Sequence, residues 1–465
     1  MADLRGLPRL TPLVLVALAG CAAEAAPPPV AADYAIEGVA VLPMDGSPAL
    51  EGQTVLIEGD RIVALGAGTQ VSVPEGATRI DGSGRWLMPG LAEMHAHVPG
   101  GNAPRQLLED ILFLYVANGI TTIRGMLGAP EQLGWREEIA SGALLGPTFL
   151  VGAPSLNGNT APTPADAERL IREHAAAGYD FQKIHPGVPL DAWDRMVEVA
   201  REVGFTYGGH VPEDVGLEHA LQTGIATVDH MDGFLQAAIP EDVQRRFAAE
   251  LGVIPTARIL DAVDDARLRE LVQRTREEGA WVVPTSYLWE NFYRPLDPDS
   301  MLALPEMRYV PASMRQGWVR QKAGMPAESA AVGEQMAQVR LDLLRMLHEA
   351  GVPLLMGTDS PQMYNVPGFA LHHEMRLMEQ VMSPEDVLVT GTRNVGDYVA
   401  RSLGGDGTFG TVATGQRADL LLLEADPRET VANVTRMAGV FVRGRWIPEQ
   451  EIARQLERIG ERYAP

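Results

Sequence analysis

In this 465-residue chain, six residues of types that bind metals or move protons stand at or near the ends of short apolar runs. They are His95, His97, Lys183, His210, His230 and Asp359. Side chains two positions apart on a β-strand point to the same face, so a strand over 91–97 would make His95 and His97 a chelating pair. A solvated or hydrogen-bonded pair of histidines has the same spacing.

Lys183 interrupts an apolar run in a chain with only one other lysine, Lys322. A buried ammonium is costly, so it must be paired, have a lowered pKa or be chemically changed. Three roles fit: a Schiff-base nucleophile, a salt-bridged structural lysine, or an amine carboxylated by carbon dioxide that bridges two metals. Asp359 fits either a metal ligand or the cap of a following helix.

The elements that must position these residues alternate between strands and helices over 88–405. Such alternation is typical of parallel α/β folds, and eight units predict a (β/α)8 TIM barrel. The predicted strands are centred on 91–97, 121–125, 148–152, 181–185, 206–210, 227–230, 281–285 and 353–359. The six residues then gather at the carboxyl ends of strands one, four, five, six and eight, where barrel active sites lie.

Both ends of the chain carry alternating β patterns. Residues 34–87 and 406–450 are expected to form one small composite β-sandwich, followed by a helical tail over 451–465. Between Thr285 and about Ala330 no single helix is predicted. Six aromatic residues in this segment either line a substrate pocket or pack the insertion onto the barrel: Tyr287, Trp289, Phe292, Tyr293, Tyr309 and Trp318.

The first residues predict a targeting signal and not a part of the folded domain. Residues 1–20 have the basic start and short apolar stretch of a signal peptide, too short for a permanent membrane span. Leu18-Ala19-Gly20-Cys21 resembles the lipobox of bacterial lipoproteins, which implies lipidation of Cys21. The resemblance implies an outer-membrane anchor on the periplasmic side, with 21–33 as a tether. A plain secretory signal and a periplasmic protein are the alternative.

Composition excludes several classes. Hydrophobic residues make up 46% and charged residues 21%, as in ordinary globular proteins. The formal net charge of −23 argues against a nucleic-acid partner. A single cysteine excludes a disulfide framework. The expected partner is a small molecule, with membrane contact only through the N-terminal anchor, and a homo-oligomer is left open.

These motifs together resemble the amidohydrolase superfamily. The resemblance rests on Met88-Pro89-Gly90-Leu91 leading into His95-Ala96-His97, on the strand-end lysine and histidines, and on Gly357-Thr358-Asp359. It extends from about Tyr34 to Trp446, and Gly209-His210-Val211-Pro212 places the chain near the imidazolonepropionase-related and Xaa-Pro-dipeptidase-like branch. Imidazolonepropionase itself lacks the lysine, so Lys183 argues against that activity.

The resemblance implies two divalent metals, with zinc expected first and manganese as an alternative. His95, His97 and Asp359 would bind one metal and His210 and His230 the other, with carboxylated Lys183 bridging them. A metal-bridging hydroxide would attack the substrate, and Asp359 would act as general acid and base.

The implied reaction is cleavage of an amide or peptide C–N bond in a small N-acyl amino acid or dipeptide. Candidate substrate-binding residues are His185, Arg124, Asn157, Tyr207, Tyr287 and Tyr364. The five other histidines, His174, His219, His348, His372 and His373, are interpreted as structural or solvated. Lactone, carbamate or phosphotriester hydrolysis on the same site is the rival activity, and a non-catalytic lipid-anchored binding protein is the rival of another class.

Overall fold

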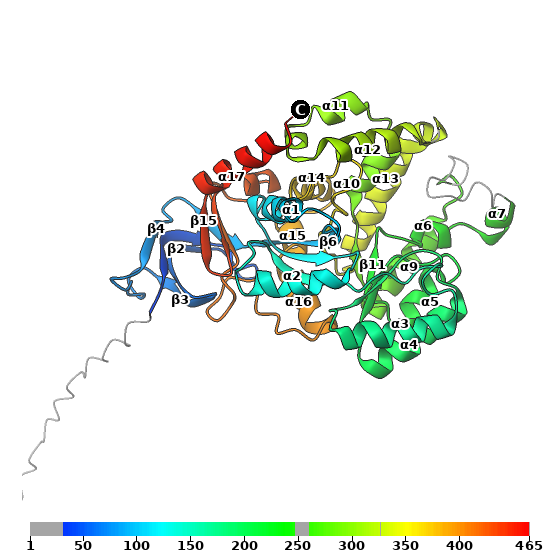
Figure 1. The fold of residues 1–465 in the computed structure, drawn as a ribbon, viewed down its shortest axis with the longest axis horizontal. Coiled ribbons are helices and arrows are strands. Elements are labelled where there is room, and N and C mark those ends of the chain that lie inside the picture. Colours follow the sequence, from blue (N-terminus) through cyan, green and yellow to red (C-terminus); the bar gives the residue numbers. More distant parts are fainter. Residues whose placement is uncertain (1–30, 247–259, 326, 465) are drawn as a thin grey trace, which may run out of the picture.

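The computed structural model describes residues 31–246, 260–325 and 327–464 (Figure 1). The predicted signal peptide, Cys21 and most of the predicted tether lie outside the described residues. Within the described part of the chain, no helix combines the length and the apolar character that crossing a bilayer requires.

Strands from both chain ends join into one eight-stranded sheet, in the order β15-β14-β13-β5-β1-β2-β3 with β4 beside β1. Its N-terminal strands are β1 (Tyr34–Val41), β2 (Leu50–Glu58), β3 (Arg61–Ala67), β4 (Thr78–Asp81) and β5 (Trp86–Pro89). Its C-terminal strands are β13 (Leu420–Leu423), β14 (Met437–Val442) and β15 (Arg445–Pro448). β5 joins the two ends, because it pairs with β1 on one side and with β13 on the other.

The barrel strands are β6 (Leu91–Ala96), β7 (Ile120–Gly125), β8 (Thr148–Val151), β9 (Gln182–Ile184), β10 (Tyr207–Gly209), β11 (Thr227–Asp229) and β12 (Trp281–Val283). Neighbours pair in parallel within a three-stranded and a four-stranded sheet. Isolated parallel bridges complete the ring: Gly152 to Phe181 and Leu156 to Ile184 join β8 to β9, and Val282 to Leu354 and Ala96 to Ser360 insert the eighth segment. The predicted TIM barrel with a composite β-domain is confirmed.

Helices follow the barrel strands and cover the ring (Figure 1). They are α1 (Arg105–Ala117), α2 (Pro130–Ala140), α3 (Pro164–Ala177), α4 (Leu190–Val203), α5 (Gly216–Thr223), α6 (Phe234–Ala237), α7 (Glu241–Arg246), α9 (Asp265–Glu278), α13 (Ala327–Glu349), α14 (Phe369–Met378), α15 (Pro384–Thr390) and α16 (Arg393–Ser402). The ends of α3 illustrate how local sequence sets helix boundaries. Thr163 caps the first turn, Pro164 is the first helical residue, and Gly178 ends the helix with a φ of 85°.

The long connection after β12 folds into four short elements instead of one helix. These are α10 (Ser286–Tyr293), α11 (Pro298–Leu302), the 3-10 helix η2 (Pro305–Tyr309) and α12 (Ala312–Ala323). The C-terminal helix α17 (Glu449–Arg462) lies beside α1, where Asp110 accepts hydrogen bonds from Arg462 and from the Tyr463 hydroxyl at 2.7 Å. The last helix therefore ties the end of the chain to the barrel.

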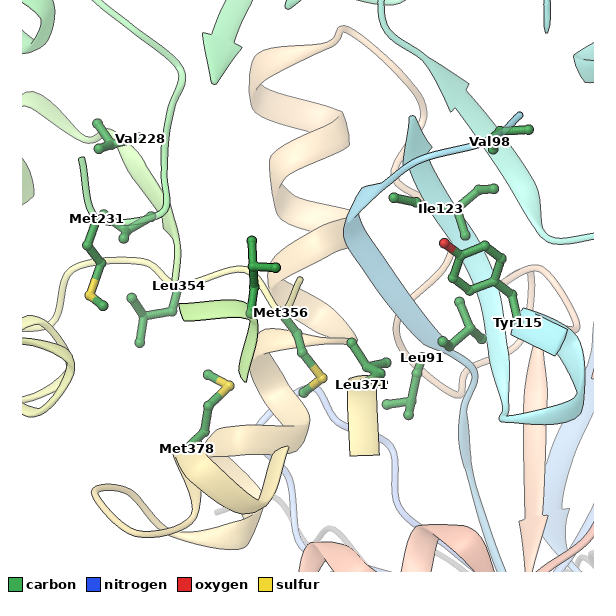
Figure 2. Packing of buried hydrophobic residues seen from close by; sticks show 14 of the residues in the cluster. Leu91, Val98, Tyr115, Ile123, Val228, Met231, Leu354, Met356, Leu371 and Met378 are labelled. Carbon is green, nitrogen blue, oxygen red and sulfur yellow. The ribbon is translucent and has the colours of Figure 1, made fainter. Parts of the chain in front are cut away.

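One apolar core fills the space between the barrel strands and their helices. Figure 2 shows Leu91 of β6 and Met356 of the eighth segment near Leu371 and Met378 of α14. All four side chains are fully buried. This packing fixes the first and last strands of the ring against each other, and it is at their ends that His95 and Asp359 lie.

Candidate metal centre

Three of the predicted ligands converge at the open end of the barrel. His95, His230 and Asp359 each offer one ligand atom, and these atoms all lie within 4.8 Å of one another. His95 Nε2 lies 3.7 Å from Asp359 Oδ1, and His230 Nε2 lies 3.8 Å from Asp359 Oδ2. Residues far apart in the sequence thus form one potential metal-binding cluster.

His97 and His210 extend this cluster on two sides. His97 Nε2 lies 2.6 Å from Asp359 Oδ1, so this histidine contacts the carboxylate directly. The His210 ring lies 4.5 Å from the His230 ring, and its Nδ1 lies 2.7 Å from Asp232 Oδ2. The five predicted His and Asp ligands therefore occupy one continuous site.

Lys183 lies in β9 with its side chain completely buried. Its Nζ atom has no hydrogen-bond partner. Burial lowers the pKa of this amine to about 8, although Asp229 and Asp359 favour the charged form. Gly209 faces it from β10, where a Cβ atom would lie 3.0 Å from Lys183 Cδ. An amine of this pKa is substantially neutral in mildly alkaline solution, as carboxylation by carbon dioxide requires.

The donor set fits a divalent metal. Lys183 Nζ, His95 Nε2 and His230 Nε2 are all buried without a hydrogen-bond partner. Burial lowers the pKa of both histidines well below the ordinary value, which keeps them neutral and able to donate a lone pair. Buried polar atoms normally find partners. Three orphaned atoms beside one carboxylate indicate a ligand that these residues share.

Backbone strain marks the same site. His230, Thr285 and Asp359 all have left-handed backbone angles, with φ values of 64°, 48° and 62°. Such angles are costly for residues other than glycine and persist where surrounding structure imposes them. At His230 the left-handed turn breaks the alternation of the strand, which brings both Asp229 and His230 to the barrel interior.

Further polar residues hold the ligands in place. Asp229 Oδ2 lies 2.7 Å from His95 Nδ1, and the Thr285 hydroxyl lies 2.8 Å from His230 Nδ1. In both rings this leaves Nε2 for a metal, the usual arrangement of supporting contacts. Glu93, also buried, accepts hydrogen bonds from the backbone N–H groups of His95 and Thr358. Burial raises the pKa of Glu93 to about 8.

Two of the predicted substrate-binding residues do not reach the site. Arg124 is fully buried in the barrel, where its guanidinium binds Asp229 at 2.8 Å and the Met94 carbonyl at 2.7 Å. Its role is to hold Asp229: burial opposes ionisation of that carboxyl, but Arg124 and Lys183 outweigh the effect and lower its pKa. Tyr207 turns outward, packs edge-on against Trp193 and donates to the Thr223 carbonyl at 2.5 Å. Both side chains are buried in this structure, Arg124 completely, and their assignment to a substrate pocket stays a prediction.

Three other candidates make their contacts with residues outside the metal cluster. Asn157 shapes its own loop, where its side-chain oxygen accepts from the N–H groups of Asn159 and Thr160. Tyr287 stacks on His373 with ring centres 4.5 Å apart. Tyr364 is buried edge-on against Trp318, and its hydroxyl has no partner.

His185 is the predicted substrate residue that lies beside the metal ligands. Its ring centre lies 5.1 Å from that of His210, and its buried Nδ1 has no partner. Burial and the nearby Lys183 lower its pKa to about 2, so it is neutral at physiological pH. A neutral imidazole can offer a substrate either a donor or an acceptor.

The aromatic insertion contributes one ring to the edge of the site. Trp289 of α10 lies 5.9 Å from the His230 ring, and its indole N–H has no partner. Arg340 of α13 lies over Trp289 and donates to the carbonyls of His230 and Pro284. Trp289 thus fits a pocket role, whereas Arg340 braces the ends of β11 and β12.

The supporting residues were absent from the sequence-based prediction. Asp229 directly precedes a predicted ligand, but alternation along a strand places the two on opposite faces. Asp232 follows His230 by two residues, and this nearness in sequence could have indicated a supporting carboxylate. Thr285, Glu93 and Arg340 reach the site only through tertiary packing, so no local pattern reveals them.

The amidohydrolase family model matches residues 86–447. An enamidase from Eubacterium barkeri is 28% identical over 244 residues, which span 47% of this chain and 62% of the enamidase. An imidazolonepropionase from Ralstonia nicotianae is 27% identical over 408 residues, covering 82% of this chain and 88% of that enzyme. The structure of an Xaa-Pro dipeptidase with bound methionine superposes with a TM-score of 0.61 at 17% identity, over 89% of this chain and 99% of that one.

Proposed function

Because the chain is a hydrolase of the amidohydrolase family, we propose that it cleaves an amide or peptide C–N bond of a small N-acyl amino acid or dipeptide. The observation that carries the proposal is the cluster of His95, His230 and Asp359 beside the unpartnered Lys183. The choice of a C–N bond is supported by two relatives, one named an enamidase and the other an imidazolonepropionase.

In the proposed site, His95, His97 and Asp359 would hold one divalent ion, and His210 and His230 a second. Lys183, carboxylated on Nζ, would contribute oxygen donors between them. Zinc suits a set of imidazole and carboxylate ligands, and manganese is the alternative. Bound divalent ions supply Lewis acidity that polarises a carbonyl and lowers the pKa of water.

The protein residues supply the proton chemistry and the positioning. Asp359 lies 3.7 Å from His95 Nε2 and 3.8 Å from His230 Nε2, so it would accept the proton of the attacking water and pass it to the leaving nitrogen. His97, which contacts Asp359, would orient that carboxylate. His185 and Trp289 would contact the substrate beside His210 and His230.

A substrate panel tests the reaction. Dipeptides with proline second, N-acyl aromatic amino acids and simple lactones are compared with the metal-loaded enzyme. Turnover of the amides, abolished in Asp359→Asn, is expected. Turnover of lactones, carbamates or phosphotriesters alone would replace the amide proposal with the rival hydrolase. The absence of any turnover in a fully metal-loaded protein would favour the non-catalytic binding protein.

The cell envelope is the proposed location, on the strength of the lipobox-like sequence before Cys21. Metabolic labelling with a fatty acid tests it: the chain should be labelled, and Cys21→Ser should not. An unlabelled chain found in the periplasmic fraction would support the plain signal peptide instead.

A further inference from the structure

A cavity lies away from the metal ligands, between α14, η2, the end of α1 and the C-terminal helix α17. Its volume is about 520 Å³, within the range of small-molecule sites. Its polar lining includes Glu306, His372, His373, Arg376 and Glu449. None of these belongs to the metal centre, so the cavity is a separate feature of the fold.

His372 gives this cavity an unsatisfied polar group. Its side chain is 5% exposed, and its Nδ1 atom has no hydrogen-bond partner. The ring also bonds the backbone of Asn118, while burial lowers its pKa to about 4. The neutral ring that results leaves a buried nitrogen lone pair facing no donor. A buried acceptor without a donor is costly, so a donor from outside the chain would stabilise it.

Two opposite charges complete the lining. Arg376 on α14 is exposed and has no ion pair within 4 Å among the described residues, although its charge helps to lower the pKa of Glu306 in the same lining. Glu449, in the first turn of α17, is also exposed and has no ion pair among the described residues. His373 is different, because it already pairs with Glu306 at 2.8 Å. The cavity also has an apolar wall, which includes Leu304, Phe369, Met437, Ile452 and Leu456.

We propose that this cavity binds a free α-amino acid with an apolar side chain. The carboxylate pairs with Arg376, and the ammonium donates to His372 Nδ1 and pairs with Glu449. The side chain packs on the apolar wall. A zwitterion with an apolar body matches all three kinds of lining at once, whereas a simple anion would leave Glu449 repelled and His372 without a donor.

The cavity is linked to the metal centre through one helix. His373 stacks on Tyr287 of α10, and the next residue, Glu374, accepts hydrogen bonds from the N–H groups of Ser286 and Tyr287. Thr285, just before α10, bonds His230. A ligand held by α14 is therefore placed to act on a metal ligand. If the proposed hydrolysis is correct, the ligand class is that of a product, and the site provides feedback.

Calorimetric titration of the metal-loaded full chain with L-leucine tests the site. Filling the cavity with Ala453→Trp, on the exposed side of α17, should weaken binding at least tenfold, and Arg376→Gln should do the same. Ala312→Trp and Arg454→Gln are matched controls outside the cavity and should bind as the wild type does. Asp359→Asn, which disables the metal centre, should still bind leucine.

The results that would overturn the proposal are distinct from failure of the proposed function. Leucine binding that Ala453→Trp leaves unchanged, or that Asp359→Asn abolishes, would place the amino acid at the metal centre. No binding to the wild type at millimolar leucine would also overturn it. Binding of 4-methylpentanoate, which lacks the ammonium group, as tightly as leucine would contradict the zwitterion assignment. All of these outcomes are binding measurements, so they can be obtained even if the protein shows no hydrolytic activity.

Discussion

The two lysines of this chain occupy opposite environments. Lys322, in α12, donates to the carbonyls of Asn291, Phe292 and Arg294 at 2.6–2.9 Å and so closes the C-terminal end of α10. Lys183 is more deeply buried, yet its Nζ has no hydrogen-bond partner. Both ammonium groups lose hydration, but only Lys322 has replaced its water with protein acceptors.

The difference shows which lysine serves structure alone. Three carbonyl oxygens at a helix end satisfy the three protons of an ammonium and complement the helix dipole. A buried amine without acceptors is unfavourable in its charged form, so Lys183 is suited to a chemical change that arginine cannot undergo. We therefore expect the two residues to respond in opposite ways to substitution.

The largest expected effect is on metal content and turnover in Lys183→Ala. Loss of the proposed shared ligand should remove bound metal and lower kcat/KM by at least ~10²–10³-fold, the scale of losing one electrostatic group in an active site. Elemental analysis and kinetics measure both. Added acetate, which supplies a carboxylate in place of the lost one, should restore part of the activity. A variant that keeps its metals and its rate would disprove the bridging role.

The next effect concerns the link between α10 and the metal centre. Thr285→Val keeps the shape of the side chain but removes the hydroxyl that contacts His230 Nδ1. Loss of such a supporting contact should weaken metal affinity about 10–100-fold. Competition with a chelator measures this affinity, and Thr275→Val, a buried threonine bonded only within α9, serves as the control. Equal affinities of the two variants would show that Thr285 does not position His230.

Lys322→Met should reduce stability while leaving the metal ligands in place. Removal of charged hydrogen bonds to three carbonyls should lower the free energy of unfolding by about 1–3 kcal/mol. Denaturant unfolding of the metal-loaded protein gives this value, and metal content should stay that of the wild type. Unchanged stability would mean that water replaces the lysine at the end of α10 without loss.

The smallest expected effect is a gain of stability in Lys183→Met after metal removal. Burial lowers the pKa of Lys183 from 10.5 to about 8. Between these pH values the unfolded chain binds more protons than the folded one, so wild-type stability rises with pH and is lowest below pH 8. At pH 7 the metal-free methionine variant should have a melting temperature a few degrees above that of the metal-free wild type. This difference in melting temperature should close toward pH 10.5. A gap that does not depend on pH would contradict a depressed pKa.

Much of the candidate site was predictable because its ligands follow strand ends. His95 lies near the end of β6, His210 and His230 directly follow β10 and β11, and Asp359 ends the eighth segment. The carboxyl ends of barrel strands share one face. Substrate-binding residues were harder, because side-chain direction was not fixed by local pattern. Arg124 and Tyr207 lie on strands as predicted, but Arg124 binds Asp229 within the barrel and Tyr207 faces the outer helices.

The sequence by itself determined the α/β alternation, the eight segments of the barrel and the identity of the metal-type residues, because periodicity and side-chain chemistry are local properties. Only the tertiary structure decided which polar atoms remain without partners. Lys322 and Lys183 are both lysines near apolar residues, and only the folded chain reveals that one meets three carbonyls and the other none. Hydrogen-bond satisfaction depends on residues distant in sequence, and the same holds for the support that Asp229, Thr285 and Arg340 give to the metal ligands.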